Sequence, residues 1–177
     1  MIIKKTGFKG LLIIKHKNNI DSRGNLREIF NYKILKKKFI FEYCTTSKKN
    51  VFRGFHFQTK NKQAKYVNVV KGKILDIVID LRKKSKTFGK SFSIVLSKKN
   101  ALSIFIPAGF AHAYYSFDKE NIIYYKLDNY YNPKSESGIN FKDPSLKLNL
   151  PKKKMIISKK DSELMNLSEF KKKYKYL

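Results

Sequence analysis

Two of the three histidines, His56 and His112, are candidates for acid–base chemistry, because a histidine side chain gains and loses a proton near neutral pH. His56 lies in the apolar segment 51–58, and His112 follows a turn that contains proline and glycine. A histidine in a strand more often packs or hydrogen bonds than catalyses, but Arg53 and Gly54 next to His56 favour a functional role. The third histidine, His16, lies in the polar run His-Lys-Asn-Asn and is predicted to be a solvated surface residue.

A metal site is the first chemistry to test. In a regular strand, alternation would place Asn50, Phe52, Gly54, His56 and Gln58 on one face. Histidine metal sites need three or four clustered ligands, commonly with two histidines in a His-x-His pair. Gln58 occupies the second position of that pair, and no nearby glutamate completes a ligand set. The sequence therefore argues against a bound metal.

Acid–base chemistry remains, because we find no redox-cofactor loop and no nucleophilic serine motif. A histidine base and a tyrosine acid can move protons at carbons next to a carbonyl group. Four tyrosines follow the His112 segment, namely Tyr124, Tyr125, Tyr130 and Tyr131. Most of them are expected to serve as core or surface aromatics.

The net charge of +27 invites a nucleic-acid interpretation, which the composition does not favour. Only four of the 40 basic residues are arginines, and arginine is the residue with the bidentate fork for phosphate and carboxylate. We interpret the lysines as a solvated surface that can still attract an anionic substrate. The four arginines, by contrast, suggest bidentate contacts with carboxylate or phosphate groups; they are Arg23, Arg27, Arg53 and Arg82.

The length of 177 residues fits one domain, residues 1–177, and a hydrophobic content of 42% is too high for a disordered chain. No apolar run approaches the ~20 residues of a membrane span, and lysines interrupt the N-terminal apolar residues before a secretory signal could form. The single cysteine, Cys44, excludes an intramolecular disulfide. We expect a soluble, cytoplasmic protein.

Short β-branched and aromatic runs dominate from residue 27 to 127 and predict an all-β sandwich or barrel, which a jelly roll fits. A tight hairpin is predicted at Lys71-Gly72-Lys73, with glycine at a positive φ. One helix is predicted over 161–174, capped by Ser158 or Asp161, and irregular structure over 132–151. The predicted strands are 27–32, 39–44, 51–58, 66–70, 74–81, 91–96, 102–106, 111–117 and 122–127.

An ordered series of motifs is more specific than any one of these features. In chain order they are Asp21-Ser22-Arg23-Gly24, residues 50–58, residues 63–67, residues 76–82, Ser85-Lys86-Thr87-Phe88-Gly89, residues 107–112, Tyr125-Lys126, Tyr130-Tyr131-Asn132-Pro133 and Asp143-Pro144. Over roughly residues 6 to 165, this series closely resembles the dTDP-4-dehydrorhamnose 3,5-epimerase family of metal-free cupins. The resemblance implies a mainly β, cupin-type double-stranded β-helix (jelly roll) with a short C-terminal helix. It also implies a homodimer that needs no cofactor and acts on a nucleotide-linked 4-keto-6-deoxy sugar.

The same resemblance implies roles for particular residues. His56 matches the general base, Asp161 the carboxylate that pairs with it, Tyr125 the general acid on the opposite face of the sugar, and Lys65 a lysine near the ketone. The implied substrate-binding residues are Arg23, Glu28, Arg53, Lys65, His112, Tyr131, Glu136 and Lys160. Of these, Arg23 and Glu28 would come from the neighbouring subunit.

The sequence departs from the family pattern at four positions. Phe41 and Tyr43 stand where the family has amides that would contact the substrate, whereas Leu26 and Phe141 are conservative replacements of aromatic residues. One alternative is therefore an epimerase acting at C3 only or C5 only, on another nucleotide-linked 4-keto hexose or heptose. An alternative of another class is a sugar-nucleotide or nucleic-acid binding module without turnover, but the presence of both histidine base and tyrosine acid favours the enzyme.

Overall fold

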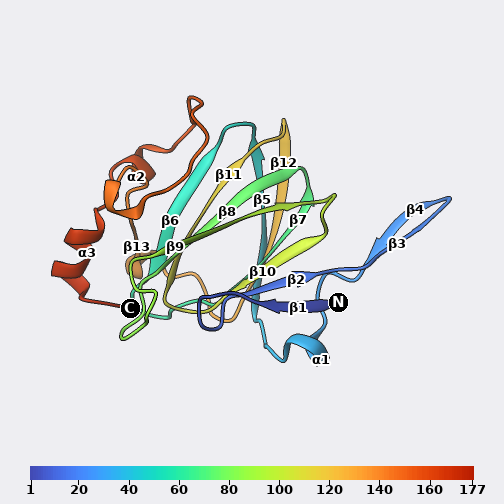
Figure 1. Ribbon diagram of the computed structural model, residues 1–177, viewed down its shortest axis with the longest axis horizontal. Coiled ribbons are helices and arrows are strands. Elements are labelled where there is room, and N and C mark those ends of the chain that lie inside the picture. Colours follow the sequence, from blue (N-terminus) through green and yellow to red (C-terminus); the bar gives the residue numbers. More distant parts are fainter.

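Two antiparallel β-sheets face each other in the computed structural model, which describes residues 1–177 (Figure 1). The first sheet has six strands in the order β1 (Ile2–Lys5), β2 (Leu12–Lys15), β10 (Leu102–Ile106), β7 (Lys65–Lys71), β12 (Glu120–Leu127) and β5 (Phe41–Lys48). The second has five strands in the order β13 (Glu136–Gly138), β6 (Phe52–Gln58), β11 (Phe110–Ser116), β8 (Lys73–Asp80) and β9 (Ser91–Ser97). This mainly β jelly-roll sandwich is the predicted fold class.

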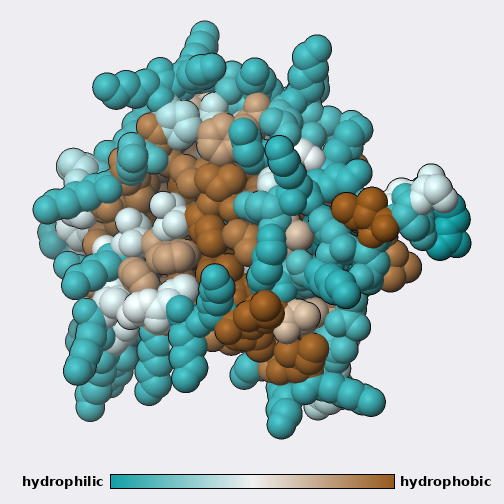
Figure 2. Space-filling view, turned by 45° about the vertical axis from the view of Figure 1, so that its right-hand side comes forward, coloured by the Kyte–Doolittle hydropathy of each residue, from teal (hydrophilic) through white to brown (hydrophobic).

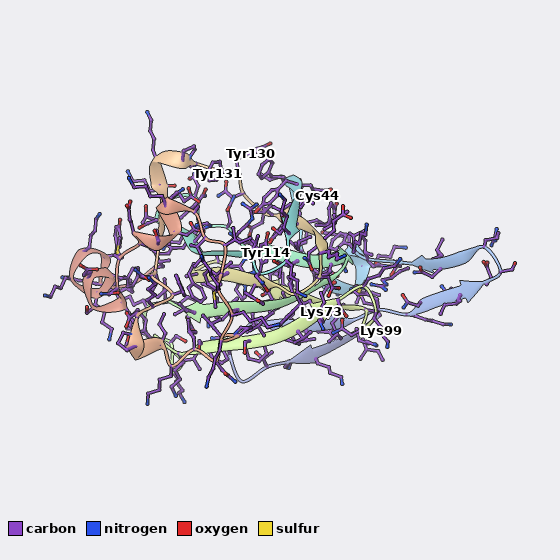
Figure 3. All side chains as sticks on the ribbon, turned by 90° about the horizontal axis from the view of Figure 1, so that it is seen from above. Cys44, Lys73, Lys99, Tyr114, Tyr130 and Tyr131 are labelled. Atoms are coloured by element: carbon purple, nitrogen blue, oxygen red, sulfur yellow. The ribbon has the colours of Figure 1, made fainter.

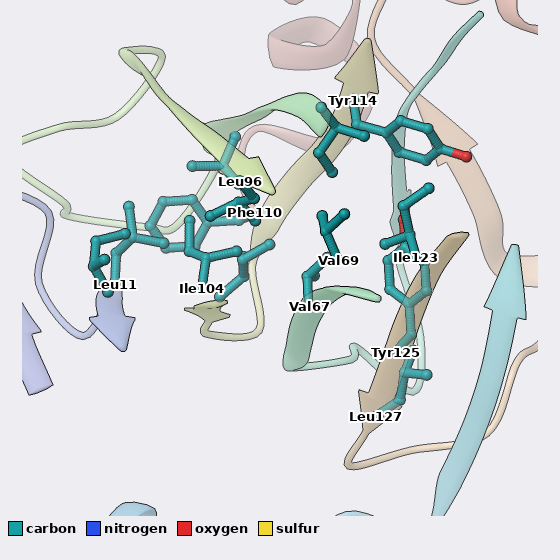
Figure 4. Close-up of a cluster of buried hydrophobic side chains, with 14 residues drawn as sticks. Leu11, Val67, Val69, Leu96, Ile104, Phe110, Tyr114, Ile123, Tyr125 and Leu127 are labelled. Carbon is teal, nitrogen blue, oxygen red and sulfur yellow. The ribbon is translucent and has the colours of Figure 1, made fainter. Parts of the chain in front are cut away.

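The main core fills the space between the two sheets (Figure 4). Alternation along each strand sends one set of side chains inward, so Val67 and Val69 of β7 meet Ile74 and Val78 of β8. Tyr114 and Tyr125 belong to the same buried cluster of 14 residues. The polar residues of the site described below extend this inward-facing layer.

A second core lies on the outer face of the five-stranded sheet, under the C-terminal segment. The helices α2 (Lys159–Ser162) and α3 (Leu167–Tyr174) lie beside β6 and β13, at the left of Figure 1. Phe170 of α3 is fully buried there against Phe57 of β6. The 3₁₀ turns Pro133–Ser135 and Pro144–Leu146 flank this region.

The outer face of the six-stranded sheet carries a third, smaller cluster around Tyr66 and Phe105, which the segment containing α1 (Tyr32–Leu35) partly covers. Between β2 and α1, a two-stranded arm of β3 (Asn18–Asp21) and β4 (Gly24–Arg27) projects away from both sheets (Figure 1). All three α-helices are too short and too polar to span a lipid bilayer.

The structure corrects two of the predicted elements. A strand over 27–32 is wrong, because β4 ends at Arg27 and the side chain of Asn31 caps α1. A single helix over 161–174 is also wrong, because Met165 forms a parallel bridge with Ile139 and divides the segment into α2 and α3. Ser158 caps α2, as expected, but the N-cap of α3 is Asn166.

Two further predictions, the hairpin at Gly72 and the solvent exposure of His16, are also wrong. Gly72 has the positive φ expected of a tight turn, but β7 and β8 belong to different sheets and do not pair as a hairpin. His16 is buried rather than solvated, with 3% of its surface exposed, and its ring is hydrogen-bonded to Ser103 and Tyr66. The polar neighbours of His16 in the sequence concealed this burial.

Candidate active site

A cavity of about 310 Å³ opens among residues of both sheets and of the C-terminal segment. Five of the residues predicted for the site line it, namely His56, Lys65, Tyr131, Glu136 and Lys160. The other lining residues are Phe41, Tyr43, Phe57, Gln58 and Gln63. Figure 2 shows one face of the molecule, on which hydrophilic side chains surround a central apolar area.

His56 is paired with Asp161 on the side away from the cavity. The Nε2 atom of His56 lies 2.7 Å from Oδ1 of Asp161, and the backbone N–H of Gly54 donates to Oδ2 at 3.1 Å. Burial acts to raise the pKa of Asp161, but the hydrogen bonds from His56 and Gly54 outweigh it and hold this pKa below its usual value. An ionised carboxylate can only accept, so in the neutral imidazole Nε2 carries the ring proton and Nδ1 is the nitrogen that can accept one.

A register shift in β6 brings Arg53 and His56 to the same face of the strand. His56 pairs with His112 and Arg53 with Tyr114, so β6 has one more residue than β11 between these pairs. As a result Phe52 packs in the second core with Phe55 and does not share a face with His56. The predicted face of Asn50, Phe52, Gly54, His56 and Gln58 is therefore wrong, because it assumed a regular strand.

Gly54 is the residue that permits this irregularity. Its φ is +122°, and a Cβ atom there would lie 2.5 Å from Cβ of Ala113 and 2.6 Å from the carbonyl oxygen of His112. Both neighbours belong to β11, so no side chain fits between the two strands at this point. Gly54 thus permits a close approach of the β6 and β11 backbones two residues before His56.

Glu136 of β13 closes the cavity beside His56. Its Oε1 atom is 4.0 Å from Nδ1 of His56, and its Oε2 atom accepts hydrogen bonds from Tyr131 (2.7 Å) and from Lys160. Burial acts to raise the pKa of Glu136, but the contacts with Lys160 and Tyr131 keep this pKa below normal. A carboxylate at this position favours a positive charge on His56.

Lys65 projects from β7 into the same cavity. Burial lowers the pKa of its ammonium group to about 8, although the nearby carboxylates of Glu136 and Asp76 act in the opposite direction. The side chain is therefore mostly charged at neutral pH and sits where it can stabilise a developing oxyanion.

Tyr125 lies on the sheet opposite to that of His56, since β12 belongs to the six-stranded sheet and β6 to the five-stranded one. The ring is 3% exposed, and it meets the ring of His112 edge-on at 6.0 Å. Burial raises the pKa of Tyr125 well above the usual value, while the hydroxyl of Thr45 lowers it. A neutral phenol at this position can donate a proton across the space between the sheets.

His112 has a carboxylate partner of its own, which the sequence analysis missed. Its Nε2 atom lies 2.8 Å from Oδ2 of Asp76, and both side chains are buried. The other oxygen of Asp76 has no hydrogen-bond partner. A signal was present, because Asp76 interrupts the apolar run of β8 at a position with the same parity as the inward-facing Ile74 and Val78.

A group of hydroxyls links Arg53 to the space beside Tyr125. The Nε atom of Arg53 donates to the hydroxyl of Ser47 at 3.2 Å, and Ser47 and Thr45 lie 2.8 and 3.2 Å from the hydroxyl of Tyr114. Figure 3 shows Tyr114 in the interior of the molecule, whereas Tyr131 lies toward its periphery. The Arg53 side chain is exposed and does not line the cavity, although its Nε atom contacts these hydroxyls.

Arg23 and Glu28 are not near this cavity within the chain. The side chain of Arg23 is 88% exposed and pairs with Asp21 in the projecting arm. Glu28 is also exposed and accepts a hydrogen bond from Asn31. No three His, Cys, Asp or Glu side chains lie close enough together to hold a metal ion.

Comparisons with known proteins define the kind of enzyme. A family model described as dTDP-4-dehydrorhamnose 3,5-epimerase matches residues 5–169. The curated enzyme of that name from Methanothermobacter thermautotrophicus is 37% identical over 93% of this chain and 94% of its own length. The one from Salmonella typhimurium is 36% identical over 85% of this chain and 86% of its own length.

Solved structures agree with these relatives. A dTDP-6-deoxy-D-glucose-3,5-epimerase from Legionella pneumophila in complex with dTDP-4-keto-L-rhamnose superimposes with a TM-score of 0.90 at 33% identity, covering 94% of this chain and 93% of its own. An epimerase from Bacillus anthracis with TDP and pyrophosphate bound gives a TM-score of 0.90 at 32% identity, covering 94% and 99%. The fold and these relatives define a cupin-type jelly-roll isomerase. More narrowly, the chain belongs to the dTDP-4-dehydrorhamnose 3,5-epimerase family.

Proposed function

We propose that this protein inverts C5 and C3 of dTDP-4-keto-6-deoxyglucose without a cofactor, giving dTDP-4-keto-L-rhamnose. The observation that supports the proposal is the His56–Asp161 pair at a cavity that Lys65 also lines, with Tyr125 on the opposite sheet against the ring of His112. Relatives of this chain bind that product or TDP in their solved structures.

The ketone at C4 acidifies the hydrogens on C3 and C5, but their removal still needs a positioned base and a stabilised enolate. Nδ1 of His56 takes the proton, and the C–H electron pair moves into an enolate whose oxygen carries the negative charge. Asp161 and Glu136 stabilise the imidazolium, and Lys65 stabilises the enolate oxygen. No electrons are lost or gained overall, so the reaction needs no redox partner.

Inversion requires that the new proton arrives from the other face of the ring. Tyr125 donates its phenolic proton to the same carbon, and the enolate collapses back to the ketone. The resulting tyrosinate is disfavoured by its burial, so it regains a proton from solvent, and His56 releases to solvent the proton it took, before the second carbon reacts. One base and one acid on opposite walls thus serve both carbons in turn.

We also propose that the active unit is a homodimer. The arm of β3 and β4 carries Arg23 outward, and the exposed apolar side chains Ile20 and Leu26 lie on it. An arm of this kind can place Arg23 and Glu28 at the cavity of a second copy, where an arginine suits a diphosphate. Size-exclusion chromatography with light scattering tests the dimer, and a monomer at working concentration would contradict it.

Incubation with dTDP-4-keto-6-deoxyglucose in D₂O tests the reaction. Proton NMR is expected to show deuterium at both C3 and C5 and conversion to the inverted sugar. Label at only one carbon would assign the protein to the single-carbon epimerases, an outcome for which Phe41 and Tyr43 in the cavity wall give a reason. Label at neither carbon, together with retained dTDP binding, would favour a binding module without turnover.

A further inference from the structure

A second tyrosine stacks on Tyr125 and also lines the cavity. Tyr43 and Tyr125 are directly opposite each other in β5 and β12, and their rings stack with centroids 4.7 Å apart at an angle of 21°. Tyr43 lines the cavity and is 36% exposed, whereas Tyr125 is 3% exposed and does not line it. Tyr43 is thus the more exposed ring of the pair and lies at the edge of the cavity, beside the phenol assigned as the acid.

Tyr43 is itself held on several sides. Its ring contacts Phe41, the neighbour two residues earlier on the same inward face of β5, at 5.8 Å. Burial raises the pKa of Tyr43 to about 12, and the charge of Glu136 and the hydroxyls of Tyr114 and Tyr131 act in the same direction. The phenol is therefore neutral across the working pH range and behaves as a fixed wall rather than as a titrating group.

We propose that Tyr43 is a positioning residue, whose ring fixes the orientation of Tyr125 and so decides how efficiently that phenol reaches the reacting carbon. The inference rests on the proposed function and deepens it. Offset-stacked aromatic pairs have a preferred geometry, and a displacement of about 1 Å in a reacting group can cost about 10²-fold in rate. No other residue stacks face to face on Tyr125, since its contact with His112 is edge-on.

This role predicts a specific kinetic signature, because base and acid lie on different sheets. Removing Tyr43 leaves the pair of His56 and Asp161 untouched, so proton abstraction continues. When Tyr125 is misplaced, the enolate regains a proton from the imidazolium on its original face. The substrate then exchanges hydrogen with solvent but is not inverted, and the ratio of exchange to inversion rises.

The experiment compares Tyr43→Leu, Tyr43→Phe and Tyr124→Leu in D₂O, with deuterium in recovered substrate and formation of inverted product both followed by NMR. Tyr124 is the matched control, since it neighbours Tyr125 on β12 but bonds to Glu42 and points away from the cavity. We expect Tyr43→Leu to slow inversion by about tenfold or more while exchange falls by less than about threefold. Tyr43→Phe keeps the stacking ring and should stay within about twofold of the wild type, as should Tyr124→Leu.

Three outcomes overturn the inference: inversion by Tyr43→Leu at the wild-type rate or faster, equal loss of exchange and inversion, or a Tyr43→Phe variant as impaired as Tyr43→Leu. Near-UV circular dichroism reports tyrosine rings directly in a chain without tryptophan, so the spectrum should change in Tyr43→Leu, which removes the ring stacked on Tyr125. A spectrum unaltered by Tyr43→Leu also counts against the stack. Absence of both exchange and inversion in the wild-type protein would instead reject the proposed function.

Discussion

Asp161 holds Nε2 of His56 at 2.7 Å, and Glu136 lies 4.0 Å from the other ring nitrogen. Asp161 fixes the tautomer of the ring, and both carboxylates can stabilise the imidazolium that forms when Nδ1 takes up a proton. Since Asp161 lies on α2 and Glu136 on β13, the base depends on the packing of the C-terminal segment against β6.

Replacing either member of the His56–Asp161 pair should slow turnover without unfolding the protein. We expect His56→Ala to reduce kcat by about 10²–10⁴-fold, the usual contribution of a general base. Asp161→Asn should reduce kcat by at least about 10²-fold, because an amide can donate to Nε2 and so stabilise the wrong tautomer. Steady-state kinetics on a verified substrate measures both; normal turnover by His56→Ala would contradict its assignment as the base.

Lys65 should impose an alkaline limit on activity. Its pKa of about 8 means that the ammonium loses its charge as the pH rises above that value, so kcat should decline there. Lys65→Arg should move this decline in kcat to higher pH. Lys65→Met should lower kcat and abolish the decline. A pH–rate profile that is unchanged in Lys65→Met would show that another group titrates.

The same residue should make stability depend on pH. The folded-state pKa of about 8 lies below the ordinary value of 10.5, so between these values the unfolded chain binds more protons than the folded one. The free energy of unfolding contributed by Lys65 therefore rises with pH through this window. Urea unfolding at pH 7, 8, 9 and 10 should show a smaller rise in Lys65→Met than in the wild type.

Asp76 should matter for both stability and turnover, because it is the buried partner of His112. Asp76→Ala leaves His112 without its acceptor, which is expected to lower the free energy of unfolding by about 1–3 kcal/mol. The exposed Asp118→Ala serves as the control and should be neutral. Denaturant titration monitored by circular dichroism decides the question, and equal stability of the two variants would refute the role given to Asp76.

Gly54→Ala should be among the most damaging small substitutions in the chain. The added methyl would overlap β11, and the φ of +122° is unfavourable for any other residue. Together these effects are expected to cost about 2–5 kcal/mol of stability. Gly7→Ala provides the comparison, since nothing lies within 4 Å of its Cβ position. A Gly54→Ala protein with the wild-type melting temperature would contradict the packing described for β6 and β11.

The lysine-rich surface should accelerate capture of an anionic substrate. A net charge of +27 produces a field that salt screens, so kcat/KM should fall by about tenfold or more between low and high ionic strength. The value of kcat itself should change little, because the chemical step takes place inside the cavity. A neutral osmolyte at matched viscosity controls for diffusion. A kcat/KM value that does not change across the salt series would show that electrostatic attraction does not accelerate substrate capture.

Local pattern was enough to predict much of the molecule. Alternating apolar residues and turn signals predicted most strands of the sandwich, because the period of a strand is visible in a short window. The motif around His56 pointed to a residue that lines the cavity, and Arg53 and Gly54 lie next to it in β6. Ordered motifs further along the chain predicted the family to which it belongs.

Tertiary structure decided the rest, since it depends on contacts between distant parts of the chain. The pairing of His112 with Asp76, the burial of His16 and the division of the C-terminal helix by a bridge from Met165 all involve residues far apart in sequence. The extra residue in β6 that turns Arg53 and His56 to one face exists only in the register with β11. The stack of Tyr43 on Tyr125 likewise requires β5 and β12 to be neighbours, because no local rule fixes which strands of a sheet will meet.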